Sequence, residues 1–225
     1  MKMINQLTVL FVVVLLSTSC KKDAAETKRI ASLTLGNYVA GGTTVKLGSR
    51  IQTVSNNGSA QLALFVGEND LYAWPINDSL NPYFTRSKFN AEDRAVYSLF
   101  LCGTPAMPEG IIIKETIPYR TDSTAGIRFI NLSPNSTALS ITRSTSPTVN
   151  EVTGLGFKSY TDYISYPGFY NSAYTFQIRN AAGALLTSFS FSASSIPRFA
   201  NVTLVIRGMV GASPALGVTR VNQDR

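Results

Sequence analysis

The sequence predicts an all-β protein that consists of two antiparallel β-sandwich domains in tandem. Short apolar or alternating segments recur at spacings of about 8–12 residues, as is typical of sandwiches, and no stretch shows a convincing helical period. One pattern also occurs twice, as an apolar strand that stops and restarts a few residues later. It is found at Ile30–Gly42 with Thr44-Val45, and again at Ala125–Pro134 with Ala138–Ile141.

The composition supports a folded core and excludes several kinds of chemistry. The chain has 225 residues, of which 44% are hydrophobic and 15% charged, so it can bury a core. It contains no histidine, the commonest general base and metal ligand. Its only cysteines are Cys20 and Cys102, which are too few for a disulfide framework or a cysteine zinc site. We therefore predict no metal site and no cofactor.

The net charge of +7 is distributed unevenly along the chain. Residues 20–118 carry 10 basic and 9 acidic residues, whereas residues 119–225 carry 9 and 4. A basic half can favour an anionic partner. The basic residues of this half are spaced rather than clustered, however, which favours a solvated basic surface. We predict no nucleic-acid partner.

The first 19 residues have the features of a signal peptide. Lys2 precedes an apolar stretch at Leu7–Leu16, and its ten residues are fewer than the roughly 20 that a membrane-spanning helix needs. Small residues then lead to Cys20. We expect cleavage before Cys20, lipid attachment to its thiol, and a polar tether over residues 20–29.

The segment Ser19-Cys-Lys-Lys-Asp23 resembles the start of mature lipoproteins of the Bacteroidetes, although Ser17 stands where the common signal has leucine. The resemblance implies a lipid-anchored protein of the cell envelope, in the outer membrane, with the membrane as its partner through the lipid. An ordinary secretory signal with an incidental cysteine is the alternative. The oligomeric state stays open.

The first domain is expected over residues 30–118. Gln61–Val66 and Leu71–Ile76 read as two strands of a hairpin, joined by turn residues at Gly67–Asp70. Ala95–Cys102 is apolar on both faces and predicts a central strand, in which Cys102 is a buried small hydrophobe. Residues 103–110 are expected to be a loop, and the last strand follows at 111–117.

The second domain is expected over residues 119–225, after a polar link at Tyr119–Thr124. It repeats the rhythm of the first, with alternating or β-branched segments separated by turn residues. The clearest predicted strands are Ile127–Leu132, Leu139–Arg143, Tyr163–Tyr166, Tyr174–Arg179, Asn201–Arg207 and Ala215–Val221.

The second half carries three segments of a known family: an opening Ile127-Arg-Phe-Ile-Asn-Leu-Ser-Pro134, a middle section at Tyr163–Phe176 with Pro167-Gly168, and a β-rich strand at Val202–Gly208. Residues 120–222 therefore resemble the domain of unknown function 4397 family. The first half resembles a diverged copy that lacks the Ser-Pro and Pro-Gly turns. The resemblance implies tandem immunoglobulin-like or transthyretin-like sandwiches on bacterial surface lipoproteins, and it implies no reaction and no catalytic residues.

Aromatic residues are the best functional lead in the sequence. Without histidine no serine triad can form, and no phosphate-binding loop occurs. Exposed aromatic rings can stack on sugars or anchor protein interfaces, although packing within the sandwiches is the alternative. The candidate ligand-binding residues form two groups: Tyr72, Trp74 and Tyr83 in the first half, and Tyr163, Tyr166 and Tyr170 in the second.

Two hypotheses on function follow. The first is a lipid-anchored, non-enzymatic binding or scaffolding module for a glycan, a polymer or another envelope protein. The alternative is a polysaccharide hydrolase that uses two carboxylates; its candidates, all in expected loops, are Glu68, Asp70, Asp78, Glu92 and Asp93. Ser79 and Ser123 lie in Asp-Ser-Leu and Asp-Ser-Thr motifs that resemble the O-glycosylation sites of the same phylum.

Overall fold

The chain folds entirely into β-structure within the residues that the computed structural model describes, which are 28–48, 50–168, 173–192 and 195–223. These residues form 16 strands and no helix, so none of their segments is a helix that could cross a membrane. Four sheets of four strands each result. The all-β prediction is confirmed, while the predicted signal peptide and Cys20 lie outside the described residues.

The first sandwich pairs two sheets. Sheet A has the strand order β4-β1-β7-β8, and sheet B has the order β3-β2-β5-β6. The strands are β1 Ile30–Asn37, β2 Val45–Leu47, β3 Thr53–Val54, β4 Gly58–Phe65, β5 Gly67–Pro75, β6 Phe84–Ala91, β7 Val96–Thr104 and β8 Met107–Lys114.

The second sandwich pairs sheet C, of order β12-β9-β15-β16, with sheet D, of order β11-β10-β13-β14. The strands are β9 Thr124–Asn131, β10 Leu139–Arg143, β11 Ser146–Leu155, β12 Ile164–Pro167, β13 Tyr174–Arg179, β14 Leu185–Phe191, β15 Ala200–Arg207 and β16 Gly217–Gln223.

The two sandwiches have the same topology, because matching β1–β8 in turn with β9–β16 converts sheets A and B into sheets C and D. In each copy the first and seventh strands run parallel, and the other pairs are antiparallel. Immunoglobulin domains place their first, second, fifth and fourth strands in one sheet. The order here differs from that arrangement, so the sandwiches do not have the immunoglobulin strand order.

Strand β7 shows how the sequence produces a central strand. Its alternate residues Tyr97, Leu99 and Leu101 enter the core between sheets A and B, whereas Phe100 and Cys102 point away from that core. Both sets are buried, as expected of a strand that is covered on both faces. The predictions of a central strand and of a buried Cys102 are confirmed.

The expected hairpin between Gln61–Val66 and Leu71–Ile76 is wrong. Strand β4 pairs with β1 in sheet A, and β5 pairs with β2 and β6 in sheet B. The chain therefore crosses between sheets at Gly67, whose φ of 102° suits glycine. A strand with one apolar face fits a hairpin or the opposite wall of a sandwich equally well. The expected loop at 103–110 is instead mostly the tight connection and first half of the β7–β8 hairpin.

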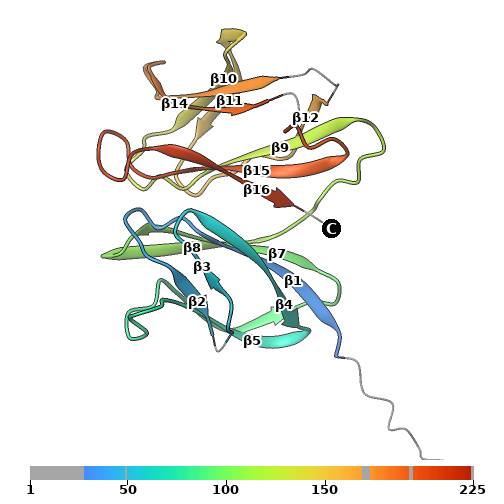
Figure 1. Ribbon diagram of the computed structural model, residues 1–225, viewed down its shortest axis with the longest axis vertical. Helices are drawn as coiled ribbons and strands as arrows, with labels where there is room; N and C mark the ends of the chain where they lie inside the picture. The colour runs from blue at the N-terminus through green and yellow to red at the C-terminus, as the bar shows by residue number, and fades with distance from the viewer. Residues whose placement is uncertain (1–27, 49, 169–172, 193–194, 224–225) are drawn as a thin grey trace, which may run out of the picture.

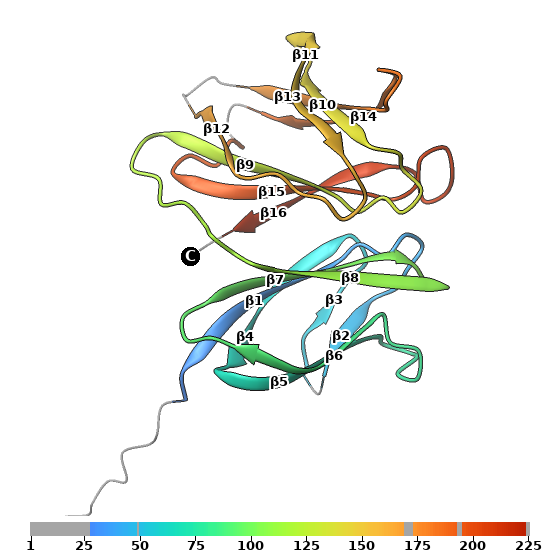
Figure 2. The same cartoon turned by 180° about the vertical axis from the view of Figure 1, so that it is seen from behind.

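The two sandwiches pack against each other through sheets A and C, which gives the molecule four stacked layers (Figures 1 and 2). A third hydrophobic cluster lies between these sheets. Its buried members are Tyr38, Phe100, Cys102 and Ile113 from the first sandwich, and Ile130, Leu132, Val205 and Val221 from the second. The halves therefore share a core and are not independent units on a linker.

Gly36 permits close packing in this contact. A Cβ at this position would lie 2.4 Å from the Tyr38 ring and 2.7 Å from the Phe100 ring. Both rings are fully buried. Any side chain at position 36 would force at least one of them out of the contact.

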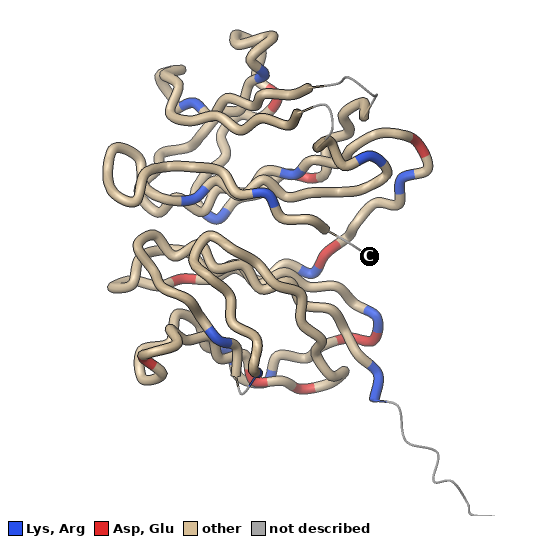
Figure 3. Tube along the Cα trace, viewed as in Figure 1, with Lys and Arg blue, Asp and Glu red and all other residues tan. Residues whose placement is uncertain are grey.

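A buried ion pair joins the two sandwiches beside the shared core. The Arg128 guanidinium donates to both Glu115 carboxylate oxygens, at 2.7 and 2.8 Å, and to the Thr203 hydroxyl. The Arg128 and Glu115 side chains are only 3% and 0% exposed. The expectation of solvated basic residues is therefore wrong for Arg128. The other charges are scattered along the trace rather than gathered in one patch (Figure 3).

Glu115→Gln should lower the free energy of unfolding by about 3–5 kcal/mol, because it leaves the Arg128 charge buried without a counter-charge. Urea denaturation measures this. The matched control is Glu92→Gln, which breaks the exposed pair with Lys114 and should change stability little. Replacing both partners with apolar residues, as in Glu115→Leu with Arg128→Met, should recover most of the loss. Equal effects of Glu115→Gln and the control would contradict this assignment.

Candidate functional site

The outer face of sheet B carries two aromatic side chains next to each other. In β5, Leu71 and Ala73 point into the core and are 2% and 0% exposed. Tyr72 and Trp74 alternate with them and therefore project outward, where both are half-buried. Their ring centroids lie 5.7 Å apart, with the planes tilted by 46°.

The neighbouring strands frame these rings. Lys46 in β2 lies directly opposite Trp74, and Thr53 in β3 lies opposite Lys46, so these side chains share one face. Beside Tyr72 on the same side is Gly48, whose amide donates to the Tyr72 carbonyl. A Cβ at Gly48 would have no atom within 4 Å other than those of its chain neighbours. Thr85 in β6 lies opposite Tyr72. We define the aromatic platform as the following six residues: Lys46, Gly48, Thr53, Tyr72, Trp74 and Thr85.

The loop between β5 and β6 is tied to the platform. The Tyr72 hydroxyl donates a hydrogen bond to the Ser79 carbonyl. Asp78 accepts from the backbone and side-chain amides of Asn81, at 3.3 and 2.9 Å. Leu80 lies on this loop and is 88% exposed. These bonds hold an apolar loop tip beside the two rings.

The other predicted aromatic residues do not belong to this site. Tyr83 is 6% exposed and lies in the first core, and Tyr166 is 3% exposed and lies in the second. The Tyr166 hydroxyl donates to Glu151. Tyr163 lies at the contact between the sandwiches, where its ring is 4.8 Å from the Arg128 guanidinium. Tyr170 lies outside the described residues.

Burial changes the acidity of both described tyrosines of the second group. It raises the pKa of Tyr163 to about 12, mainly by desolvation of the phenolate. It also raises the pKa of Tyr166, where the Glu151 carboxylate adds to the effect of burial. Both phenols therefore stay neutral at physiological pH and act as structural groups.

The carboxylates proposed for a hydrolase do not gather at one site. Glu68 and Asp70 lie in β5 and not in a loop, which corrects that expectation. Asp70 accepts from the backbone amide of Lys88, at 3.1 Å, where the chain has a φ of 53°. Asp78 orders the β5–β6 loop as described above. These groups support backbone geometry rather than a common site.

Glu92 and Asp93 lie in the turn between β6 and β7, and each has a basic partner: Lys114 for Glu92, and Arg29 for Asp93 at 3.2 Å. The bond to Glu92 raises the pKa of Lys114. Within the described residues, no three or more histidine, cysteine or acidic side chains lie close enough together to hold a metal ion.

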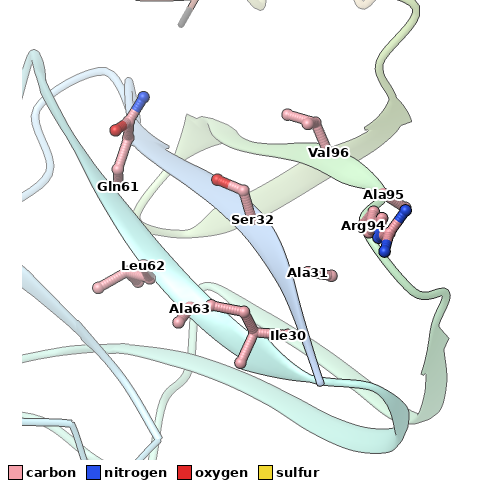
Figure 4. Close-up of a pocket in the computed structure, with 9 residues that line it drawn as sticks. All are labelled: Ile30, Ala31, Ser32, Gln61, Leu62, Ala63, Arg94, Ala95 and Val96. Atoms are coloured by element: carbon pink, nitrogen blue, oxygen red, sulfur yellow. The ribbon is translucent and has the colours of Figure 1, made fainter. Parts of the chain in front are cut away.

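A groove of about 430 Å³ lies over β1 on sheet A (Figure 4). Small or apolar side chains line it, including Ile30, Ser32, Ala63 and Val96, and its one charged lining residue is Arg94. The lining contains no carboxylate. The groove therefore has no pair of acids for glycosidic hydrolysis.

The two predicted O-glycosylation residues differ in accessibility. Ser79 is exposed on the β5–β6 loop, whereas Ser123 is half-buried just before β9. Next to Ser123, the Thr124 side chain and backbone amide donate to Asp122, which lowers the pKa of that carboxyl. Modification of either serine stays a prediction.

The fold and the site thus define a tandem β-sandwich protein with an aromatic platform on one outer sheet. No protein-family model matches the chain, and no curated protein matches it significantly. The resemblance of residues 120–222 to the domain of unknown function 4397 family therefore stays a prediction.

Cys102 is the one thiol among the described residues, and it is fully buried in the core shared by the two sandwiches. Its pKa is raised to about 12, first by desolvation and then by the Glu109 carboxylate. A thiol reacts as its thiolate. The structure therefore gives Cys102 a packing role.

Cys102 should make folding weaker at alkaline pH. Its raised pKa means that the folded state keeps a proton that the unfolded state loses, so stability is complete below pH 9.0 and falls as pH rises toward about 12. In a Cys20→Ser background, Cys102→Ala should reduce the slope of stability against pH in this window by about one proton. An aromatic disulfide reagent at pH 8 should modify Cys102 only after unfolding. Rapid modification of the folded protein would contradict the structure.

Proposed function

We propose that this protein is a lipid-anchored binding module of the cell envelope, which holds a polymer on its aromatic platform and catalyses no reaction. The observation that carries the proposal is the outward pair of rings, Tyr72 and Trp74, 5.7 Å apart on an outer sheet face. Aromatic rings combine a large apolar face with little conformational entropy to lose, so they are effective contact residues. A pair on a flat sheet suits an extended ligand such as a glycan chain.

The second sandwich supports this interpretation, because it shows what the fold itself requires at the same place. The strand that corresponds to β5 is β13, whose outward residues are Thr175, Gln177 and Arg179. The Arg179 guanidinium donates to the side chains of Gln177 and Thr142 on this face. The topology therefore forms with a polar, internally hydrogen-bonded outer face. The topology itself does not require aromatic side chains at the positions of Tyr72 and Trp74, which favours a role in binding.

Trp74→Ala should weaken retention of the protein on its polysaccharide ligand by at least about tenfold, the effect expected of a central aromatic contact. Affinity electrophoresis over a panel of soluble polysaccharides measures this. Met107→Ala is the control, since it removes a 74% exposed apolar side chain from the other sheet of the same sandwich. The thermal midpoint of each variant must be measured, because truncation of a half-buried ring also costs stability.

The same assay separates binding from hydrolysis. Retention without release of reducing ends is the expected result. Release of reducing ends that a single change at Asp70, Asp78, Glu92 or Asp93 abolishes would defeat the binding proposal in favour of the hydrolase. If no polymer is retained, the platform does not bind polysaccharide and the proposal fails.

The membrane anchor is tested separately in cells. Because the thiol of Cys20 would carry the lipid, Cys20→Ala should abolish incorporation of a clickable fatty acid and release the protein from the membrane fraction. Cys102→Ala is the matched control and should leave labelling unchanged. Undiminished labelling of the Cys20→Ala variant would refute the lipoprotein assignment.

A further inference from the structure

Two polar groups of the platform, the Lys46 ammonium and the Trp74 indole N–H, are hydrogen-bond donors without an acceptor among the described residues. Lys46 is in no ion pair within the described part of the chain. The indole N–H of Trp74 likewise has no acceptor among the described residues, and Lys46 lies directly across from it. An ammonium group and an indole N–H can only donate. A ligand at this end of the platform must therefore supply the acceptors.

The acidic residue nearest to Trp74 on the same face of β5 is distant from Lys46. Asp70 lies four residues before Trp74 in β5, which is about 13 Å along a strand. That separation exceeds the screening length of about 8 Å at physiological ionic strength. Asp78 lies on the β5–β6 loop, where its carboxylate accepts from Asn81 and keeps its charge. Lys46 is the one charged residue of the platform itself, in a half of the chain that is nearly neutral.

From this arrangement we infer that the platform selects an anionic glycan, whose sugar ring stacks on Trp74 while its carboxylate or sulfate accepts from Lys46. The inference rests on the proposed function and specifies its ligand class. Stacking alone accepts neutral and charged sugars equally, because both have an apolar ring face. The charge-assisted bond to Lys46 adds a preference for the anion.

Affinity electrophoresis of the full chain in gels that contain polygalacturonate, a sulfated galactan or a neutral glucan tests the inference. Polygalacturonate or the sulfated galactan should retain the protein several-fold more strongly than the glucan. The comparison between these two shows whether carboxylate or sulfate is preferred. Lys46→Gln should weaken retention on the preferred anionic polymer by about threefold to tenfold and weaken retention on the glucan less. Lys46→Arg should restore most of it.

Lys28→Gln is the matched control, since it removes the same charge from an exposed lysine that lies against Phe65 at the edge of sheet A. It should have little effect. Equal losses for Lys46→Gln and Lys28→Gln would show general charge attraction and overturn the inference. So would equal retention on all three polymers with no effect of Lys46→Gln, although the binding module would then stand. If the wild-type chain is retained on none of the three polymers, the proposed function itself fails.

Discussion

The contact between sheets A and C organises the rest of this structure, and the buried Arg128–Glu115 pair is the part of that contact that tolerates least change. Two charges that are 3% and 0% exposed are tolerable only because each is the other's partner. The pair bridges the two sandwiches, and Thr203 accepts from the same guanidinium. Any sliding of one sandwich over the other would leave an unpaired charge in an apolar environment. The ion pair therefore fixes the register of the two domains more than it adds net stability.

The two copies of the sandwich differ where they touch each other. Asn37 and Asn131 occupy the same position, since each ends the first strand and donates its amide to a carbonyl of the third strand, Val54 or Leu155. Counting back from these residues, Gly36 corresponds to Ile130 and Thr34 to Arg128. The first copy has the smaller side chain at these two positions and the larger one at Phe100, which corresponds to Val205 in the second copy. Complementarity of this kind lets two related faces pack together without being alike.

The sequence was sufficient to predict local structure. The strict alternation of β5 places Tyr72 and Trp74 on one face, and the uninterrupted apolar run of β7 marks a central strand. Strand β6, Phe84–Ala91, was not predicted, because four consecutive exposed residues interrupt its alternation. The sequence also did not indicate that β4 pairs with β1 rather than with β5, because this pairing depends on which sheet each strand joins. Local pattern determines the face of a strand but not its neighbours.

Burial of individual aromatic and charged residues was harder to predict, because it depends on contacts between distant segments. Tyr72 in β5 and Tyr83 just before β6 lie on either side of the same loop, yet Tyr83 fills the core and Tyr72 faces outward. Arg128 and Glu115 looked like ordinary surface charges on either side of a domain boundary. Their burial results from the stacking of one whole sandwich on another. The residues that surround Arg128 and Glu115 in the sequence do not indicate this burial.

The stacking also decides which surfaces are left for binding. Because sheets A and C cover each other, the broad free faces of the molecule are those of sheets B and D, on opposite sides of the four layers (Figure 1). The platform lies on sheet B alone, so the second sandwich contributes no residue to it. Removing it would expose Phe100 and Ile113 on sheet A, together with the Glu115 carboxylate. A large exposed apolar patch favours aggregation. The platform therefore depends on the second copy of the domain, even though that copy touches no part of it.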